Sequence, residues 1–533
     1  MTEKDFDRRC AAESFGREEN LKQRTLFRLP AAQWIAFLVA VLCFRPAWGQ
    51  QARSDEQTLA DSVQELRAQV QELRAAVAEM KSEASEYRAE NAELRKQLER
   101  LHSSAPAPAS DKPSVNVEAA QTSASLEQRV SSVEETTQLL ESELRSQYQS
   151  KVESASKYRV RFSGLVLFNL FHNRGPVDNM DVPTYSVPLT AYSPNSSFGA
   201  TLRQSELGVE VFGPKLAGAS TSGEVRFDFG GGFPNAAPVG INTGLVRLRM
   251  ASMRLDWEHT SLVAGQDALF ISPLSPTSFA SLLVPSFSYS GNLWAWTPQL
   301  RLEHTLTLGT GEKLLFQGGI LDNVSGELSY STRRMAQAGE GSGQPAYAGR
   351  VSWSKSINDR PLAFGVSGYS SQQDWGFERN VNGWATAADM RIPLAPKLDL
   401  SGEFYRGRGV GGIGGGIGQS VLFSGDPMNP YSRIRSLNSA GGWAQLKFIA
   451  NSRLEFNGVY GMDNPFSADI HAFRSPQGFY PNILAANRSA MVNFIYRPRF
   501  DLLISGEYRH LRTNSLNALS TAEQVNLTMG VLF

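Results

Sequence analysis

The sequence predicts an all-β transmembrane barrel preceded by an N-terminal α-helical coiled coil, and three observations lead to this fold class. The last nine residues, Val525 to Phe533, alternate apolar and polar side chains, as a strand with two different faces requires. A heptad repeat runs without interruption from Leu59 to Leu101. From Tyr158 onward the apolar period changes from about 3.5 residues to about 2, and the shorter period persists to the C-terminus.

The composition agrees with a barrel. Of the 533 residues only 41% are hydrophobic, while 46 are Gly, and a strand that separates lipid from water is polar on every second side chain. No stretch reaches the ~20 consecutive apolar residues of a membrane-spanning helix. Both cysteines, Cys10 and Cys43, precede the expected start of the mature chain. A mature chain without cysteine fits the cell envelope.

Residues 1–49 are predicted to be a signal peptide. Basic residues precede the apolar run Trp34–Phe44, and a small-residue pattern that ends at Gly49 follows it. This run is too short to span a bilayer and matches the hydrophobic region of a secretory signal. An inner-membrane anchor and a lipoprotein lipidated at Cys43 are the alternatives.

Residues 50–102 are predicted to form a periplasmic coiled coil. One a position of its heptads is polar, Asn91, and a single polar a residue fixes the register and the number of strands. Val at a with Leu at d favours two strands. Residues 103–125, rich in Ala, Pro and Ser, are predicted to be a linker, and residues 126–156 a short helical segment.

Residues 157–533 are predicted to form the barrel. Apolar residues alternate with charged ones in successive hairpin arms, and no segment of helical period follows that would cover the apolar faces. Uncovered apolar faces on so many strands need lipid. Divided among 16–18 strands, this region gives roughly 21–24 residues for each strand and its connection. A strand of a soluble sheet is the alternative for the C-terminal stretch alone.

Basic side chains are in excess in the predicted barrel. Residues 157–533 carry 32 basic and 27 acidic side chains, a net charge of 32 − 27 = +5, and Arg outnumbers Lys by 26 to 6. Guanidinium groups in a low-dielectric wall attract carboxylate and phosphate. The candidates for lining a pore and binding anions are Arg161, Arg226, Arg247, Arg249, Arg254 and Arg301. The competing interpretation is a set of ion-pair ladders, formed with Glu206, Glu210, Asp228 and Asp256.

Two segments of the predicted barrel are unsuited to strands. Ile271–Pro285 contains three prolines, too many for a central strand, and we expect either a loop that folds into the lumen or an external loop. Gly407–Gly418 superficially resembles a phosphate cradle. Such a cradle needs a preceding strand and a following helix in a βαβ unit, and a mobile extracellular loop is predicted instead.

No catalytic constellation is visible in the sequence. The histidines of the barrel region are scattered singly, without the spacing of metal ligands, and no G-x-S-x-G motif occurs. We therefore expect no enzyme activity, no cofactor or metal, and no nucleic-acid partner. An enzymatic barrel remains open as an alternative, because a lumen can bring together groups that are distant in sequence.

The barrel region resembles the DcaP-type outer-membrane porins, which are related to the phosphate-selective porins. The motifs that carry the resemblance lie at 203–211, 223–231 and 442–445. The resemblance implies about 16 antiparallel strands per barrel, a homotrimer, and passage of small anionic solutes such as dicarboxylates. The chain ending at Phe533 also resembles the assembly signal of bacterial outer-membrane barrels, which is read by the barrel-assembly machinery.

Two functions follow from these expectations. The first is a passive porin in outer-membrane lipid, with a periplasmic coiled coil that assists trimerisation or tethering. The second is a structural barrel that anchors the envelope, whose coil binds peptidoglycan or a periplasmic partner.

Overall fold

A computed structural model describes residues 159–191, 193–232, 244–326, 334–473 and 483–533. The predicted signal peptide, coiled coil with Asn91, linker and short helical segment lie outside the described residues. Among the described residues, no helix is long and apolar enough to cross a membrane.

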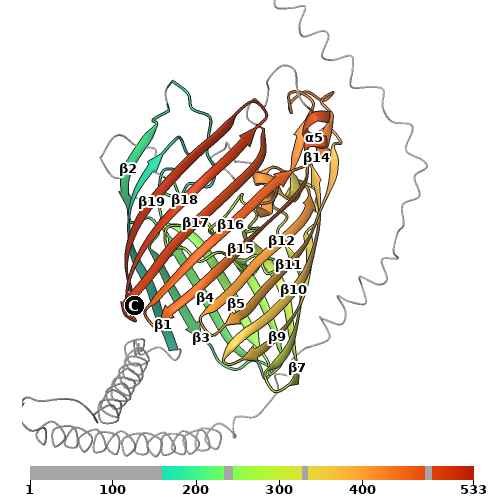
Figure 1. The fold of residues 1–533 in the computed structure, drawn as a ribbon. Helices are drawn as coiled ribbons and strands as arrows, with labels where there is room; N and C mark the ends of the chain where they lie inside the picture. Colours follow the sequence, from blue (N-terminus) through green and yellow to red (C-terminus); the bar gives the residue numbers. More distant parts are fainter. Residues whose placement is uncertain (1–158, 192, 233–243, 327–333, 474–482) are drawn as a thin grey trace, which may run out of the picture. The chain divides into compact units, whose positions relative to one another are not determined.

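The described strands form one closed antiparallel barrel (Figure 1). The first strand, β1 (Arg159–Arg174), pairs with the last, β19 (Leu519–Leu532), which closes the sheet. Both β2 (Ser196–Thr201) and β3 (Glu206–Phe212) pair with β1, so together they fill one position. The 17 strands of the sheet thus occupy 17 − 1 = 16 positions, which confirms the predicted fold class and strand number for this part of the chain.

The other strands of the barrel follow in chain order. They are β4 (Ser220–Asp228), β5 (Arg247–Asp256), β6 (Thr260–Ala268), β7 (Trp296–Gly309), β8 (Glu312–Leu321), β9 (Ala346–Ile357), β10 (Arg360–Asp374), β11 (Asn380–Ala395), β12 (Leu398–Arg408), β15 (Asn438–Asn451), β16 (Leu454–Pro465), β17 (Leu484–Arg499) and β18 (Leu502–Ser515).

The closing strand shows how the sequence pattern sets the two faces of the wall. On β19, Val525, Leu527 and Met529 are each 45–55% exposed, whereas Asn526 and Thr528 are each 1% exposed. The apolar row therefore faces outward and the polar row faces the lumen, as the alternation predicts. An apolar outer belt around a closed sheet is the arrangement that a bilayer requires.

Phe533 extends the pairing of the closing strand with β1. Its backbone N–H donates to the carbonyl of Gly164 at 3.0 Å, and its carbonyl accepts from the N–H of Gly164 at 2.9 Å. The aromatic side chain is 63% exposed. Its role as an assembly signal stays a prediction.

The two ends of the barrel differ in their connections. Short turns join β7 to β8 and β9 to β10, whereas residues 229–246 join β4 to β5 and residues 269–295 join β6 to β7. Outer-membrane barrels place short turns in the periplasm and long loops outside the cell. The smaller elements belong to the long loops: α4 (Ala338–Gly341), η1 (Gly411–Ile413), η2 (Gly416–Gly418), β13 (Val421–Phe423), β14 (Ile434–Ser436) and α5 (Ser467–Ala472).

Candidate functional site

The connection 269–295, here called the inner loop, folds into the lumen. The Ser272 hydroxyl donates to the carboxyl of Glu403 at 2.5 Å, and the backbone N–H of Leu274 donates to the same carboxyl at 2.8 Å. Glu403 lies on β12 and is 7% exposed, next to Phe404, which faces outward. The prediction that the proline-rich segment enters the lumen is confirmed, and the alternative of an external loop is wrong.

Further strands hold the middle of the inner loop. The Thr277 N–H donates to Gln445 on β15 at 2.7 Å, and the Ser278 hydroxyl donates to Glu507 on β18 at 2.5 Å. From β1, the amide of Asn169 donates to the carbonyl of Phe279 at 3.0 Å. We call β12 to β18 the anchoring wall, because its inward polar side chains bind the loop directly.

The inner loop also provides hydrogen-bond partners for polar side chains that are buried in the barrel wall. Arg509 on β18 is 3% exposed; it donates to Glu507 at 2.7 Å and to the hydroxyl of Ser281 at 3.2 Å. Gln204 donates to the carbonyl of Ala280 at 3.2 Å. Buried polar groups are costly unless they are hydrogen-bonded, so these contacts fix the path of the loop.

The glycine-rich segment packs inside the barrel beside the inner loop. The backbone N–H of Trp294 donates to the carbonyl of Ile413 at 3.0 Å, and the backbone N–H of Gly416 donates to the Tyr405 hydroxyl at 2.8 Å. Ile413 is only 2% exposed. The prediction of a mobile extracellular loop is therefore wrong. Glycine is needed here for close approach, since a Cβ at Gly412 would lie 2.0 Å from a backbone oxygen.

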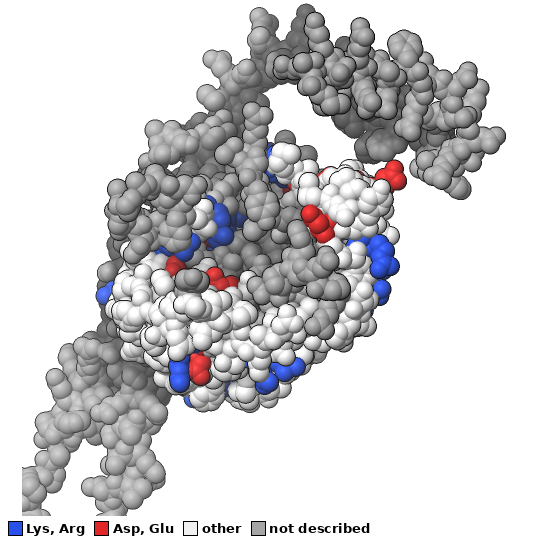
Figure 2. Space-filling model, turned by 90° about the horizontal axis from the view of Figure 1, so that it is seen from above, with Lys and Arg blue, Asp and Glu red and all other residues white. Residues whose placement is uncertain are grey.

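The wall from β3 to β11, here called the charged wall, carries five of the six candidate arginines. Arg226 lies on β4, Arg301 on β7, and the other three on β5. The sixth, Arg161, lies on β1 near the short-turn end. When the barrel is viewed from its long-loop end, basic and acidic side chains lie close together around the opening (Figure 2).

Every candidate arginine has a carboxylate partner. Arg254 contacts Asp256 at 2.6 Å and Glu303 at 3.0 Å, and Arg301 contacts the same Glu303 at 2.8 Å. The remaining pairs are Arg161–Glu210, Arg226–Glu224, Arg247–Asp228, Arg249–Glu206 and Arg301–Asp267. All four carboxylates named in the competing interpretation are among these partners. The ladder thus neutralises much of the positive charge that the sequence suggested.

Two of these arginines also share an aromatic ring. The guanidinium carbons of Arg247 and Arg249 lie 5.0 Å and 4.5 Å from the ring centroid of Trp296. Arg247 in addition donates to the carbonyl of Leu283 in the inner loop at 2.6 Å. This contact connects the charged wall to the loop.

The sequence reasoning missed the most buried ion pair of the charged wall. Arg350 on β9 binds Asp389 on β11 through two parallel hydrogen bonds of 2.8 and 3.1 Å, and the two side chains are 8% and 7% exposed. The pair closes over β10 at Gly365, where a Cβ would lie 2.2 Å from the Asp389 carboxylate. Such a contact between strands two positions apart depends on register.

The reasoning also missed Arg391, which lacks a partner. Arg391 lies two residues after Asp389 on β11 and shares its inward face. It is exposed, and its side chain makes no ion pair or hydrogen bond within the described part of the chain. The alternation around Asp389 was the signal that could have found it.

Arg391 lines a cavity of about 270 Å³ beneath the inner loop. Leu274 and Thr277 of the loop border the cavity, and Arg360 and Lys447 are its other basic lining residues. Arg360 pairs with Asp399 and Lys447 with Glu455. The guanidinium of Arg391 is therefore available to a solute anion on the short-turn side of the loop.

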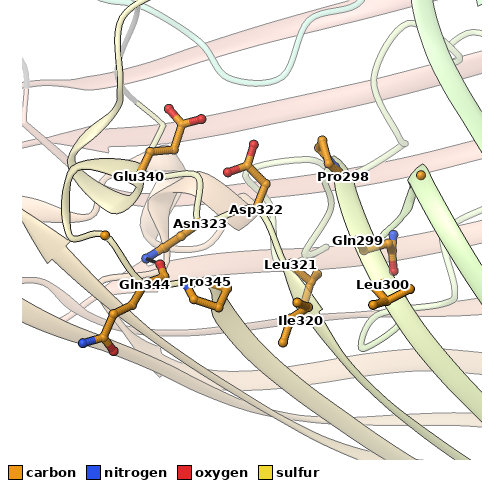
Figure 3. A pocket seen from close by; sticks show the side chains of 12 residues that line it. Pro298, Gln299, Leu300, Ile320, Leu321, Asp322, Asn323, Glu340, Gln344 and Pro345 are labelled. Atoms are coloured by element: carbon orange, nitrogen blue, oxygen red, sulfur yellow. Dashed lines mark hydrogen bonds between the residues drawn. The ribbon is translucent and has the colours of Figure 1, made fainter. Parts of the chain in front are cut away.

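A second hollow, of about 540 Å³, has the opposite charge (Figure 3). The carboxylates of Asp322 and Glu340 approach each other at its edge, and Arg334 contacts both. Burial first, and then the neighbouring Glu340, raise the pKa of Asp322. Leu300 and Ile320, which line this hollow, are 45% and 40% exposed on the outward face. The hollow thus lies at the strand wall, where the outward Leu300 and Ile320 and the buried Gln299 and Leu321 all line it.

The described residues contain no group of three or more His, Cys, Asp or Glu side chains that could hold a metal ion. The polar groups of the lumen instead bind one another or the inner loop. Within the described residues, this arrangement offers a charged passage in which the Arg391 side chain lines a cavity without a carboxylate partner.

Comparisons with solved structures identify the same barrel fold elsewhere. The crystal structure of the outer membrane channel DcaP of Acinetobacter baumannii aligns with 72% of this chain and 100% of its own, at 14% identity and a TM-score of 0.54. An anion-selective porin from Comamonas acidovorans aligns with 71% of this chain and 100% of its own, at 10% identity and a TM-score of 0.44. No family model and no curated protein sequence matches. The first likeness agrees with the resemblance drawn from the sequence motifs and establishes the fold.

Proposed function

We propose that this chain is an outer-membrane porin that forms a diffusion channel for small anionic solutes, with dicarboxylates as the leading class. The observation that carries the proposal is the cavity beneath the inner loop, where Arg391 faces the lumen without a carboxylate partner. A guanidinium held in a narrow, low-dielectric passage raises the local concentration of anions and repels cations. The barrel fold shared with an outer membrane channel supports the passive mechanism.

The six candidate arginines have a secondary part in this proposal. Because each is paired with a carboxylate, the charged wall is close to neutral, and Arg391 supplies the net preference. A solute carboxylate that passes Arg254 or Arg301 competes with Glu303 for their donors. The proposed channel is therefore weakly anion-selective.

Reversal potentials under a salt gradient test the proposed selectivity. In planar bilayers the full-length protein is expected to prefer anions, and Arg391→Glu is expected to shift the reversal potential towards cation preference. Arg408→Glu is the matched control, because Arg408 is exposed on β12 opposite the outward Trp384. Cation preference of the unaltered protein, or an equal shift in both variants, would refute the proposal.

We further propose that the working unit is a homotrimer, inserted by the barrel-assembly machinery, with the predicted coil in the periplasm. If the coil only assists trimerisation or tethering, deletion of residues 51–156 leaves the conductance of each pore unchanged. Loss of pore current in the deletion variant would show that the coil is part of the channel.

The packing inside the barrel also favours a second candidate, a structural barrel whose coil anchors the envelope to peptidoglycan or a periplasmic partner. The inner loop and the glycine-rich segment both occupy the upper lumen and bind each other. Single-channel recording separates the two functions. A porin gives steady current steps, whereas a plugged anchor gives none.

A further inference from the structure

The outward face of β17 and β18 carries two arginines that face each other. Arg488 and Arg512 are directly opposite in the register of these strands. Within the described residues, neither side chain makes an ion pair or a hydrogen bond. Like charges directly opposite on neighbouring strands destabilise a sheet. An anion that binds between the two guanidinium groups would therefore relieve their repulsion.

The surroundings of this pair are also basic. Arg174 and His510 lie on the same outward face, and both contact Glu523, at 3.9 and 3.8 Å. The connections nearest in sequence, 474–482 and 516–518, contain no Asp or Glu. Glu523 thus contacts Arg174 and His510, and it makes no ion pair with Arg488 or Arg512.

An apolar groove of about 510 Å³ begins next to the arginine pair. Small outward residues, Gly458 and Ala490, line its floor, and Tyr460, Val492 and Tyr508 stand around it with 41–58% of their surfaces exposed. Ala490 follows Arg488 by two residues on the same face of β17. The groove thus lies on the short-turn side of the basic pair and crosses the outward face from β18 to β12, within the apolar belt.

The pair and the groove together match one kind of ligand. A lipid of the outer leaflet has an anionic phosphate at the membrane surface and an acyl chain beneath it. Arginine is suited to phosphate because its donors match the geometry of two phosphate oxygens. The two tyrosines beside the groove suit the boundary between chain and headgroup.

We propose that Arg488 and Arg512 bind the phosphate of an outer-leaflet lipid whose acyl chain lies in the groove along Gly458 and Ala490. The site is on the outside of the barrel and is independent of the solute pathway. It fixes the lipid at the long-loop end of β17 and β18.

Native mass spectrometry of the full-length protein in detergent tests the site, with lipid A as the phosphorylated probe. The double variant Arg488→Gln/Arg512→Gln is expected to bind lipid A roughly 30-fold more weakly, as two arginines near a charged headgroup would predict. Arg499→Gln, at the opposite end of the same strand, is the matched control and is expected to bind as the unaltered protein does. Equal binding by the double variant and the control would overturn the proposal.

Two further arms separate the occupants of the site. Gly458→Leu fills the groove and leaves both arginines, so it is expected to weaken lipid A binding at least tenfold; it also tests the site if the double variant fails to fold. Inorganic phosphate is expected to compete only weakly. Competition as strong as that of lipid A would show a simple anion site, and cross-links from position 488 or 512 to a second copy would show a subunit interface. Either result would overturn the lipid assignment.

Discussion

The two walls of the lumen satisfy their polar side chains in different ways. On the charged wall, carboxylates such as Asp389 and Glu303 bind arginines of the same wall. On the anchoring wall, Glu403 and Glu507 bind hydroxyl groups and a backbone N–H of the inner loop. Both walls show the same alternation of inward polar and outward apolar residues. The difference therefore lies in the partners of the inward carboxylates, which are arginines on the charged wall and the inner loop on the anchoring wall.

This difference assigns separate tasks to the two walls. Where a loop packs against the strands, hydrogen bonds to its backbone hold it in one place and leave little room for water. The charged wall also contacts the loop, through Arg247 and Ser367, but its carboxylates pair with arginines of neighbouring strands instead of with the loop. Ion pairs that are removed from water depend strongly on both partners, whereas hydrogen bonds to the loop can be lost one at a time. Substitutions on the charged wall should therefore lower the stability of the barrel, whereas substitutions on the anchoring wall should loosen the inner loop.

The largest effect is expected from breaking the buried pair of the charged wall. Arg350→Met leaves the Asp389 carboxylate buried without its partner, at a cost of about 3–5 kcal/mol in the free energy of unfolding. The double variant Arg350→Met/Asp389→Leu removes both charges and is expected to recover most of this loss. Denaturant unfolding in lipid vesicles measures both. A single variant within about 1 kcal/mol of the unaltered protein would mean that water reaches the pair.

A smaller effect is expected on the anchoring wall from Glu403→Ala. This change removes two hydrogen bonds to the inner loop, each worth about 0.5–1.5 kcal/mol. The barrel should remain folded while the loop loosens, seen as faster hydrogen exchange at Leu274 and noisier channel current. Glu303→Ala is the control, because Glu303 binds only the charged wall. Unchanged exchange at Leu274 would show that other contacts suffice to hold the loop.

The fold was predictable because its signals are local. Alternation along β19 places Asn526 and Thr528 inside and Leu527 outside whatever the neighbouring strand is, and the same holds for β17 and β18. The partner carboxylate Asp228 was also found, since it lies directly opposite Arg247 on the neighbouring strand. These features were predictable because they depend only on the two-residue period of a strand and on contacts between neighbouring strands.

The rest depends on contacts that the chain makes only after closure. Arg350 and Asp389 meet across an intervening strand, and Glu403 meets Ser272 through a separation of 131 residues. No period or spacing encodes either contact. The prediction for the glycine-rich segment was wrong for the same reason. Its glycines permit tight packing in the lumen as readily as motion outside the barrel. The destination of a loop is a property of the closed barrel.

A modest pH effect is expected at the rim, where β15 of the anchoring wall begins. Asp469 on α5 accepts from Asn438 at 2.7 and 3.0 Å and from Arg435 at 2.6 Å. Burial alone would raise the pKa of Asp469, but the hydrogen bonds from Asn438 and the pair with Arg435 outweigh it and lower the pKa. A carboxylate with a lowered pKa contributes stability above its unfolded pKa, and this contribution disappears as pH falls through the folded value.

Hydrogen-exchange protection at the Asn438 amide is therefore expected to stay constant from pH 7 down to about 4 and to fall only below that. In Asp469→Asn, protection is expected to be lower and independent of pH over this range. Loss of protection near pH 6 in the unaltered protein would point to another titrating group.

The smallest effect is expected at the short-turn mouth, from Arg161→Gln. Arg161 and Glu210 are directly opposite on β1 and β3, 3.3 Å apart, but their side chains are 57% and 31% exposed. Water and salt screen such a pair, so its loss should cost at most about 1 kcal/mol, and the cost should vanish at about 1 M salt. Unfolding measurements at low and high salt check both values. Arg161 and Arg350 are both paired arginines of one barrel. If the two substitutions lowered the free energy of unfolding equally, burial would not set the strength of these ion pairs. The distinction between the two walls would then depend on the inner loop alone.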